Sequence, residues 1–355
     1  MQQEAKLKAL GAYIFAGGFS IGVEQHFDVL AHLENGTYGV ATYRLNRPAT
    51  PVHTSPASWP IEEYSKVGVD FVFANPPCAL FSSAGASILN GIDNWKTDPR
   101  QSCIHECFGL LEKFKPTVLV IESVVNAFTR GRELFDTLAA QAHEQGYSVT
   151  HVLENACWLG VPQVRKRYFF VAHKKTLTLH APNWAPPPTV NEILATVKDP
   201  GYTRPVKPGL VKYYEGLNQQ NGANKGIRSM WEKDNPVETH IMGPSGVMGR
   251  PRMMEHRIPY DTPMGAYIGD FCIHPTEPRN LGLEEAKALC CFPADWKFAC
   301  TPQHAFSELA RGVMPPVGEW LARGARDTIL YGSPESGNTY IVDYRDAPAP
   351  MGESL

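Results

Sequence analysis

Residues 69–83, VDFVFANPPCALFSS, combine a predicted buried strand with a rigid turn that carries a thiol. The run VDFVFA is rich in Val and Phe, which is typical of a strand covered on both faces of a parallel sheet. Pro76 and Pro77 end this strand, because proline fixes φ and has no N–H for the ladder. Cys78 should therefore lie at the carboxyl edge of the sheet, where open α/β folds place their chemistry. Taken alone, such a cysteine is more often structural than nucleophilic.

Strands and helices alternate on both sides of this stretch. The segments predicted as strands are 11–16, 28–35, 67–77, 117–124, 147–155 and 167–173. The segments predicted as helices are 38–48, 102–116, 131–147, 281–292 and 304–330. Strands separated by helices of this length indicate an α/β fold with a mostly parallel sheet and helices on both faces.

Composition places the chain among globular proteins. Its 355 residues are 43% hydrophobic and 19% charged, and the formal net charge is −3. No apolar run is long enough to span a bilayer, and the N-terminus has no signal-peptide pattern, so we expect a cytoplasmic protein.

The eight cysteines are scattered and lack the spacing of zinc ligands. Free thiols and no metal are therefore expected.

The sequence predicts four segments along the chain. Residues 1–180 carry the alternating pattern of a catalytic domain, and residues 181–304 are irregular and rich in Gly, Pro, Met and Asn. Residues 305–331 return to helix. Residues 332–355 have few apolar side chains and three prolines, which is typical of a flexible tail.

Seven short segments carry a more specific signal through their order. They are FAGGFSIGVE at 15–24, LAHLENGTYGVATYRLNRP at 30–48, ANPPCALFSSAG at 74–85 followed by DPR at 98–100, IESV at 121–124, GVPQVRKRYFFVA at 160–172, PRNLGLEEAKALCCFPADWKF at 278–298 and GVMPPVGEWLAR at 312–323. In this order they resemble the motifs of the DNA cytosine-5 methyltransferases. The resemblance implies a Rossmann-like S-adenosylmethionine-dependent methyltransferase fold, with 181–304 as a smaller target-recognition domain. It also implies a monomer that acts on double-stranded DNA.

The resemblance implies a catalytic set of three residues. Cys78 matches the nucleophile, Glu122 the carboxyl that contacts N3 and the exocyclic amine, and Arg165 the arginine that contacts the base carbonyl. Cytosine C5 is a poor nucleophile, so a thiolate must first add to C6, and the target base must be flipped out of the duplex. The residues expected to support these three are Pro77, Ser82, Gln163 and Arg167.

Two further groups follow from the same resemblance. The residues expected to bind the cofactor, S-adenosylmethionine or a variant of it, are Tyr13, Phe15, Ala16, Gly17, Gly18, Phe19, Glu34, Asn35, Ser58, Asn75, Pro76, Arg311 and Val313. The residues expected to contact DNA are Ser83, Arg250, Arg252 and Arg257, the three arginines as candidates for phosphate or guanine contacts.

The cofactor loop departs from the family pattern FAGxGG. Either the loop is two residues shorter, or it aligns without a gap as YIFAGG and places Phe15 where a glycine is expected. A bulky side chain there would crowd a nucleotide, because glycine lets the backbone approach it closely. The family's adenine-contacting aspartate is also missing, and Ser58 is the nearest polar candidate.

The segment ELARGVMPPV departs from the family pattern GNxVxxP, because alignment on Val313 and Pro316 puts Arg311 at the asparagine. Three explanations stand. Arg311 pairs with a local acid such as Glu308 or Glu319; or the protein is an inactive DNA-binding homologue; or the donor is carboxy-S-adenosylmethionine and the product 5-carboxymethylcytosine. Methylation of RNA cytosine by the same chemistry is a further alternative.

Overall fold

The computed structural model describes residues 6–55, 59–81, 94–203, 256–258, 260–265, 268–269, 272–277 and 279–346. This part contains an eight-stranded sheet with the order β12-β6-β8-β5-β4-β1-β2-β3. Its strands are β1 Lys8–Ala12, β2 Asp28–Leu33, β3 Val52–His53, β4 Phe71–Ala74, β5 Val118–Val124, β6 Ser148–Asn155, β8 Lys166–His173 and β12 Thr339–Tyr344. Neighbouring strands are parallel, except that β8 is antiparallel to both β5 and β6. The predicted mostly parallel sheet is confirmed.

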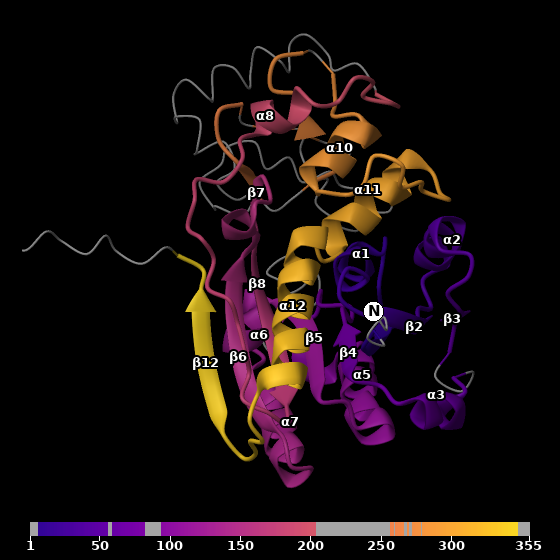
Figure 1. Cartoon of the computed structure of the whole chain (residues 1–355). Helices are drawn as coiled ribbons and strands as arrows, with labels where there is room; N and C mark the ends of the chain where they lie inside the picture. Colours follow the sequence, from indigo (N-terminus) through magenta and orange to yellow (C-terminus); the bar gives the residue numbers. More distant parts are fainter. Residues whose placement is uncertain are drawn as a thin grey trace, which may run out of the picture.

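Helices cover both faces of this sheet (Figure 1). One hydrophobic cluster joins the sheet to α1 and α12, and a second joins the opposite face to α3, α5, α6 and α7. The helices are α1 Gly18–Val23, α2 Thr37–Asn46, α3 Ile61–Val67, α5 Gln101–Phe114, α6 Val125–Thr129, α7 Arg132–Glu144 and α12 Pro315–Tyr331. The arrangement is the Rossmann-like α/β fold expected from the sequence.

Strand β4 places the sequence stretch FVFANPPC at the centre of the sheet. All four β4 residues are buried, because β4 pairs with β1 on one side and β5 on the other. The chain leaves β4 at its carboxyl end, so Cys78 lies beside the carboxyl end of β5. This is the edge at which ligands bind in open α/β sheets.

Four short elements lie beyond the carboxyl ends of the parallel strands, above the arrowhead of β12 in Figure 1: β7 Gln163–Val164, α8 Val190–Leu194, α10 Leu283–Leu289 and α11 Pro302–Arg311. The remaining short elements are η2 Asn94–Thr97, η3 Ala156–Leu159, β9 His256–Arg257, β10 Met264–Gly265 and β11 Cys272–Ile273. Helix α8 begins with a capping box between Thr189 and Glu192. The division into domains at residues 180, 304 and 331 stays a prediction.

The segment expected to be a flexible tail differs in the structure. Residues Thr339–Tyr344 form β12, which pairs in parallel with β6 and extends the sheet by one strand. The sequence TYIVDY has the aromatic and β-branched residues of a strand, but an edge strand needs little burial and so leaves a weak hydrophobic signal.

Within the described residues, no helix is both long and apolar enough to cross a membrane, and no group of His, Cys, Asp or Glu is arranged to hold a metal ion.

Candidate active site

Cys78 lies on the loop that follows β4. The loop turns back on itself, because the Phe81 N–H donates to the Cys78 carbonyl over 3.0 Å. The Cys78 side chain is half-buried. Burial and the nearby Glu122 raise the pKa of the thiol to about 11, whereas Arg167 and Arg165 oppose that shift. Cys78 is therefore a thiol at neutral pH until a cation or a substrate lowers its pKa.

Glu122, near the end of β5, is 1% exposed and held from two sides. The Asn75 Nδ2 donates to its Oε2 over 2.6 Å, and the Arg167 Nε lies 3.0 Å from its Oε1. Burial raises the pKa of Glu122, while Arg167 and Arg165 oppose the shift. A carboxyl group so placed can hold a proton and donate it to a base nitrogen. The structure thus brings Cys78, Glu122, Asn75 and Arg167 together.

The two arginines of QVRKR have different environments. Arg165 is 2% exposed, and one of its terminal nitrogens donates to the Gly312 carbonyl over 2.9 Å. Its backbone N–H donates to the Asn155 side chain over 3.0 Å. Arg167, by contrast, directs its Nε to Glu122. Arg165, between β7 and β8, therefore ties this point of the chain to the segment between α11 and α12, and Arg167 is the arginine in contact with Glu122.

Gln163 also has a structural partner. Its side-chain amide donates to the Leu289 carbonyl over 2.7 Å and contacts the Cys290 sulfur at 3.4 Å. This contact attaches β7 to α10. Gln163 therefore joins two segments, and its supporting role in the reaction stays a prediction.

The cofactor loop adopts left-handed backbone at two non-glycine residues, Tyr13 with φ 55° and Phe15 with φ 48°. Phe15 thus has the conformation that glycine adopts most easily, which favours the ungapped alignment YIFAGG. The Tyr13 hydroxyl donates to Glu106 of α5. Its ring packs in the core on that side of the sheet, away from the other cluster, which contains Ala16 and Phe19.

The loop glycines serve close packing between protein segments. A Cβ on Gly17 would lie 2.9 Å from the Trp296 ring, and a Cβ on Gly18 would lie 2.2 Å from the Val313 carbonyl. Gly17 also has φ 91°. These glycines therefore let the loop approach the segment before α11 and the segment between α11 and α12.

Glu34 follows β2 and faces the same loop. Its carboxylate accepts hydrogen bonds from the backbone N–H of Phe15 over 3.0 Å and of Gly36 over 2.6 Å. Burial raises the pKa of Glu34, and these N–H donors oppose the shift. The neighbouring Asn35 is exposed.

Glu308 was not identified from the sequence as a site residue. It is 9% exposed, and burial and the charge of Glu34 raise its pKa to about 7, while Arg311 opposes the shift. A Cβ on Gly39 would lie 2.9 Å from the Phe15 carbonyl and 3.4 Å from both the Glu308 Oε2 and the Glu34 Cδ. Three acceptor groups therefore meet at Gly39 of α2, where the packing is too close for a side chain. In the sequence only the i, i+3 spacing of Glu308 and Arg311 could have indicated it.

Glu34 is the structural test for a nucleoside cofactor. Its carboxylate has acceptor capacity beyond its two backbone donors. A ribose offers vicinal hydroxyl donors, which such acceptors bind. The residues present therefore fit a nucleoside donor of the S-adenosylmethionine type.

Arg311 ends α11 with an exposed side chain. Among the described residues no ion pair within 4.0 Å involves it, because Glu319 lies 2.8 Å from His26 and 3.5 Å from Arg323. Glu308 is close enough for its pKa to be affected by Arg311 but makes no ion pair with it. The explanation that Arg311 pairs with a local acid therefore finds no contact in this part of the chain.

Several expected site residues lie outside the described part. They are Ser58, Ser82, Ser83, Arg250 and Arg252, together with the side chain of Arg257. The backbone of Arg257 belongs to β9, which pairs with β11.

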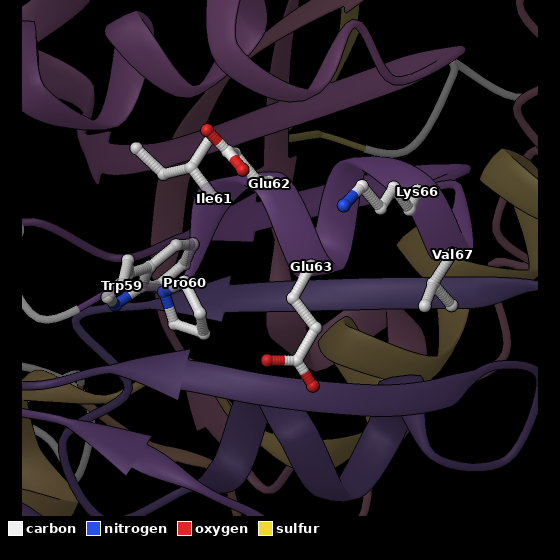
Figure 2. A pocket seen from close by; sticks show the side chains of 7 residues that line it. All are labelled: Trp59, Pro60, Ile61, Glu62, Glu63, Lys66 and Val67. Atoms are coloured by element: carbon white, nitrogen blue, oxygen red, sulfur yellow. The ribbon is translucent and has the colours of Figure 1, made fainter.

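A hollow of about 690 Å³ lies over α3, and Figure 2 shows the side chains around it. Its lining residues are Trp59, Pro60, Ile61, Glu62, Glu63, Lys66 and Val67. None of the expected catalytic or cofactor residues lines it, so we do not assign it to the active site.

Residues 11–325 match the family model of the C-5 cytosine-specific DNA methylases. The chain belongs to this family.

Among curated relatives, the type II methyltransferase M1.HphI of Haemophilus parahaemolyticus is 26% identical over 332 residues, covering 86% of this chain and 83% of the relative. M.DdeI of Desulfomicrobium norvegicum is 29% identical over 184 residues, which are 50% of this chain and 43% of that protein. M.AgeI of Thalassovita gelatinovora is similar over 38% of its length. The chain thus spans less than half the length of M.DdeI and M.AgeI.

Solved structures share the fold. A prophage-encoded E. coli protein described as a DNA modification methyltransferase superposes with a TM-score of 0.63 at 19% identity, covering 91% of this chain and 99% of that one. The methyltransferase EhMeth of Entamoeba histolytica superposes with a TM-score of 0.59 at 12% identity, covering 91% and 99%.

Proposed function

We propose that this protein alkylates C5 of a cytosine in duplex DNA through a covalent bond between Cys78 and C6, and that the group transferred is a methyl. The observation that carries the proposal is the contact set around Glu122. Asn75 from the Cys78 loop and Arg167 from β8 both reach its carboxylate. We expect the protein to act as a cytoplasmic monomer on a base flipped out of the helix.

The Cys78 sulfur would add to C6, which makes C5 nucleophilic. Glu122, kept protonated more readily by its burial, would donate to N3 as the sulfur adds. C5 would then take the alkyl group, and the donor would leave as a neutral thioether. Loss of the C5 proton to water would expel the Cys78 sulfur from C6 and restore the aromatic ring, and the N3 proton would return to Glu122. Arg167 and Arg165 favour the thiolate, because both lower the pKa of Cys78.

Arg167 is the better candidate for the contact with the base carbonyl. Arg165, which the sequence favoured for this role, already donates to the Gly312 carbonyl. Arg167 lies at Glu122, the residue expected to bind the opposite edge of the same ring. Its guanidinium has five N–H donors, enough for a carboxylate and a carbonyl together.

S-adenosylmethionine would supply an electrophilic methyl group on a sulfonium. Glu34 would accept hydrogen bonds from the ribose hydroxyls, because its carboxylate has acceptor capacity beyond its two backbone donors. Glu34 also fixes the cofactor loop, because its carboxylate accepts a hydrogen bond from the backbone N–H of Phe15.

The covalent step can be tested with duplex DNA that contains 5-fluorocytosine. Fluorine at C5 cannot leave as a proton does, so the adduct persists after transfer. We expect wild-type protein with S-adenosylmethionine to form a DNA adduct that mass spectrometry maps to Cys78, and Cys78→Ser to form none. Cys157→Ser, a buried cysteine in η3, is the matched control. An adduct on another residue, or an active Cys78→Ser variant, would contradict the proposal, and DNA binding without product would favour the inactive homologue.

A second candidate function is transfer of a carboxymethyl group from carboxy-S-adenosylmethionine. The observation that favours it is Arg311, an exposed cation at the end of α11 next to the Gly312 segment that approaches Phe15. A sulfonium would be repelled by this charge, whereas a carboxylate on the transferred carbon would pair with it. A charge-assisted pair of about 3 kcal/mol corresponds to about 100-fold in donor preference.

Donor preference can be measured directly. Each donor would be incubated with duplex DNA, and with RNA as a second substrate, and the digested nucleosides weighed. If Arg311 sets the donor, Arg311→Asn should move the preference toward the plain donor by about 100-fold. Arg132→Asn, on the far helix α7, should leave it unchanged. An unchanged preference in Arg311→Asn excludes the carboxymethyl function, and modification of RNA alone excludes DNA as the substrate.

A further inference from the structure

Glu154 is a buried carboxyl group that the catalytic scheme does not use. It lies near the end of β6, is 0% exposed, and neither of its oxygens has a hydrogen-bond partner among the described residues. Leaving an ionised carboxylate buried and unpaired is very unfavourable, so such a group is retained only where something compensates it or where it stays neutral.

The strand register places Glu154 beside the active site. Glu154 of β6 and Val124 of β5 are both partners of Arg167 on β8. Directly paired residues point to the same face of a sheet, and Glu122 shares that face because it lies two residues before Val124. Arg167 therefore lies between two buried glutamates, one on each neighbouring strand.

We propose that Glu154 is a positioning residue for the alkyl transfer, acting as a second carboxyl group that competes with Glu122 for Arg167. This inference rests on the proposed function. While Glu154 is neutral, the Arg167 guanidinium is held by Glu122, to which its Nε lies 3.0 Å away. Once Glu154 ionises, Arg167 has a charged acceptor on each side, and its contact with Glu122 and the base weakens.

The surroundings of Glu154 keep it neutral at physiological pH. Burial raises its pKa to about 8, opposed by Arg167 and then by Arg165. The other titratable groups that face it are Cys157 of η3, whose pKa it raises, and Tyr344 of β12, its register partner. Helix α12 covers this face of the sheet. Its charged residues Glu319 and Arg323 form an ion pair of 3.5 Å with each other.

Strand β12 completes this enclosure. Tyr344 packs against Trp184 and Trp320, with ring centroids 6.0 and 6.1 Å apart. The side chains of Asn155 and Trp158 donate to the Arg345 carbonyl over 3.3 and 3.1 Å. An apolar wall on this side raises the free energy of the ionised form and so keeps the proton on Glu154.

The charge of the whole cluster explains why a neutral Glu154 helps the reaction. With Glu154 neutral, the positive charges of Arg165 and Arg167 are offset only by the ionised fraction of Glu122, which burial reduces, and the surplus positive charge favours the Cys78 thiolate. Ionisation of Glu154 removes that surplus. Loss of the Glu154 proton therefore disfavours the Cys78 thiolate and also weakens the contact between Arg167 and Glu122.

The test is the pH profile of single-turnover adduct formation with 5-fluorocytosine DNA. Glu154→Gln has the shape of the neutral acid and should keep the neutral rate within about threefold. Ionisation of the Cys78 thiol raises the rate with pH in both proteins, so the quantity to follow is the ratio of the wild-type rate to the Glu154→Gln rate. Above pH 8 this ratio should fall, reaching about one tenth of its neutral value near pH 9, because each pH unit above the pKa of Glu154 lowers its neutral fraction about tenfold. The exposed-site control Glu144→Gln should follow the wild type.

A second readout does not depend on activity. The infrared absorption of protonated carboxyl groups at pH 7 should be weaker in Glu154→Gln than in the wild-type protein, by the contribution of one group. A rate ratio that does not change above pH 8, a folded Glu154→Gln that is inactive at neutral pH, or no difference in the infrared absorption would each overturn the positioning role alone. A wild type that forms no adduct at any pH would overturn the proposed function as well.

Discussion

Glu34 and Glu308 place two carboxyl groups beside the cofactor loop, and each affects the protonation of the other. Glu34 is stabilised by two backbone N–H groups, whereas Glu308 has none of these donors among the described residues. The proton shared by this pair therefore resides mainly on Glu308, whose pKa is raised to about 7. The nearby Arg311 opposes the shift without making an ion pair.

The raised pKa of Glu308 predicts how stability depends on pH. The folded state binds an extra proton between pH 4.5, the ordinary pKa, and about pH 7, so Glu308 lowers the free energy of unfolding as pH rises through this window. The total loss is about 3 kcal/mol. Glu308→Gln should lose that part of the pH dependence in urea unfolding at pH 5 and pH 8. Glu144→Gln, an exposed change on α7, should retain it, and equal pH dependence in wild type and Glu308→Gln would contradict the assignment.

At the scale of elements, α1 and α12 pack together through glycines. A Cβ on Gly22 would lie 2.3 Å from the Glu319 N and 2.5 Å from the Pro315 carbonyl, and a Cβ on Gly318 would lie 2.8 Å from the Phe19 carbonyl. Backbone meets backbone at these points, so neither helix can move without the other. This contact fixes the cofactor loop, which leads directly into α1.

Two glycine substitutions in helices should have opposite effects. Gly22→Ala should lower the free energy of unfolding by about 3 kcal/mol, because the new methyl group overlaps backbone atoms that cannot rotate away. Gly109→Ala in α5 should raise it by up to about 1 kcal/mol, because no atom lies within 4 Å and alanine favours helix. Chemical unfolding of both variants is the measurement. A stable Gly22→Ala protein would show that α1 and α12 are less tightly packed than the structure indicates.

At the scale of the whole molecule, the sheet extends beyond the residues that match the family. The family model ends at residue 325, and β12 adds an eighth strand after it. Every residue of β6 is buried, and β12 covers the edge that β6 would otherwise leave open. An open edge of a buried strand is a site for aggregation.

Truncation tests the contribution of β12. A chain that ends at Gly332 should be less stable and should aggregate, because the outer edge of β6 loses its partner strand. A chain that ends at Asp346 keeps β12 and should behave as the full-length protein does. Light scattering and thermal unfolding of both would decide the matter, and a soluble, fully stable protein ending at Gly332 would show that β12 is dispensable.

The sequence by itself determined the α/β architecture and the candidate nucleophile. Alternating apolar runs and helices are local patterns, and the proline pair before Cys78 ends a strand wherever it occurs. Family motifs in the right order added Glu122, the QVRKR pair and Glu34. These features are readable because each depends on residues that are close together along the chain.

Tertiary structure alone decided which side chains meet. Arg167 rather than Arg165 contacts Glu122, because the register of β8 against β5 sets that pairing. Glu308 reaches Glu34 across 274 residues of chain, and Glu154 lies beside Arg167 because β6 and β8 are neighbours. The sequence did not indicate β12, because an exposed edge strand is held by backbone pairing with β6. Almost any side chains are compatible with such pairing. Contacts of this kind depend on register and packing between distant segments, and local sequence patterns do not encode them.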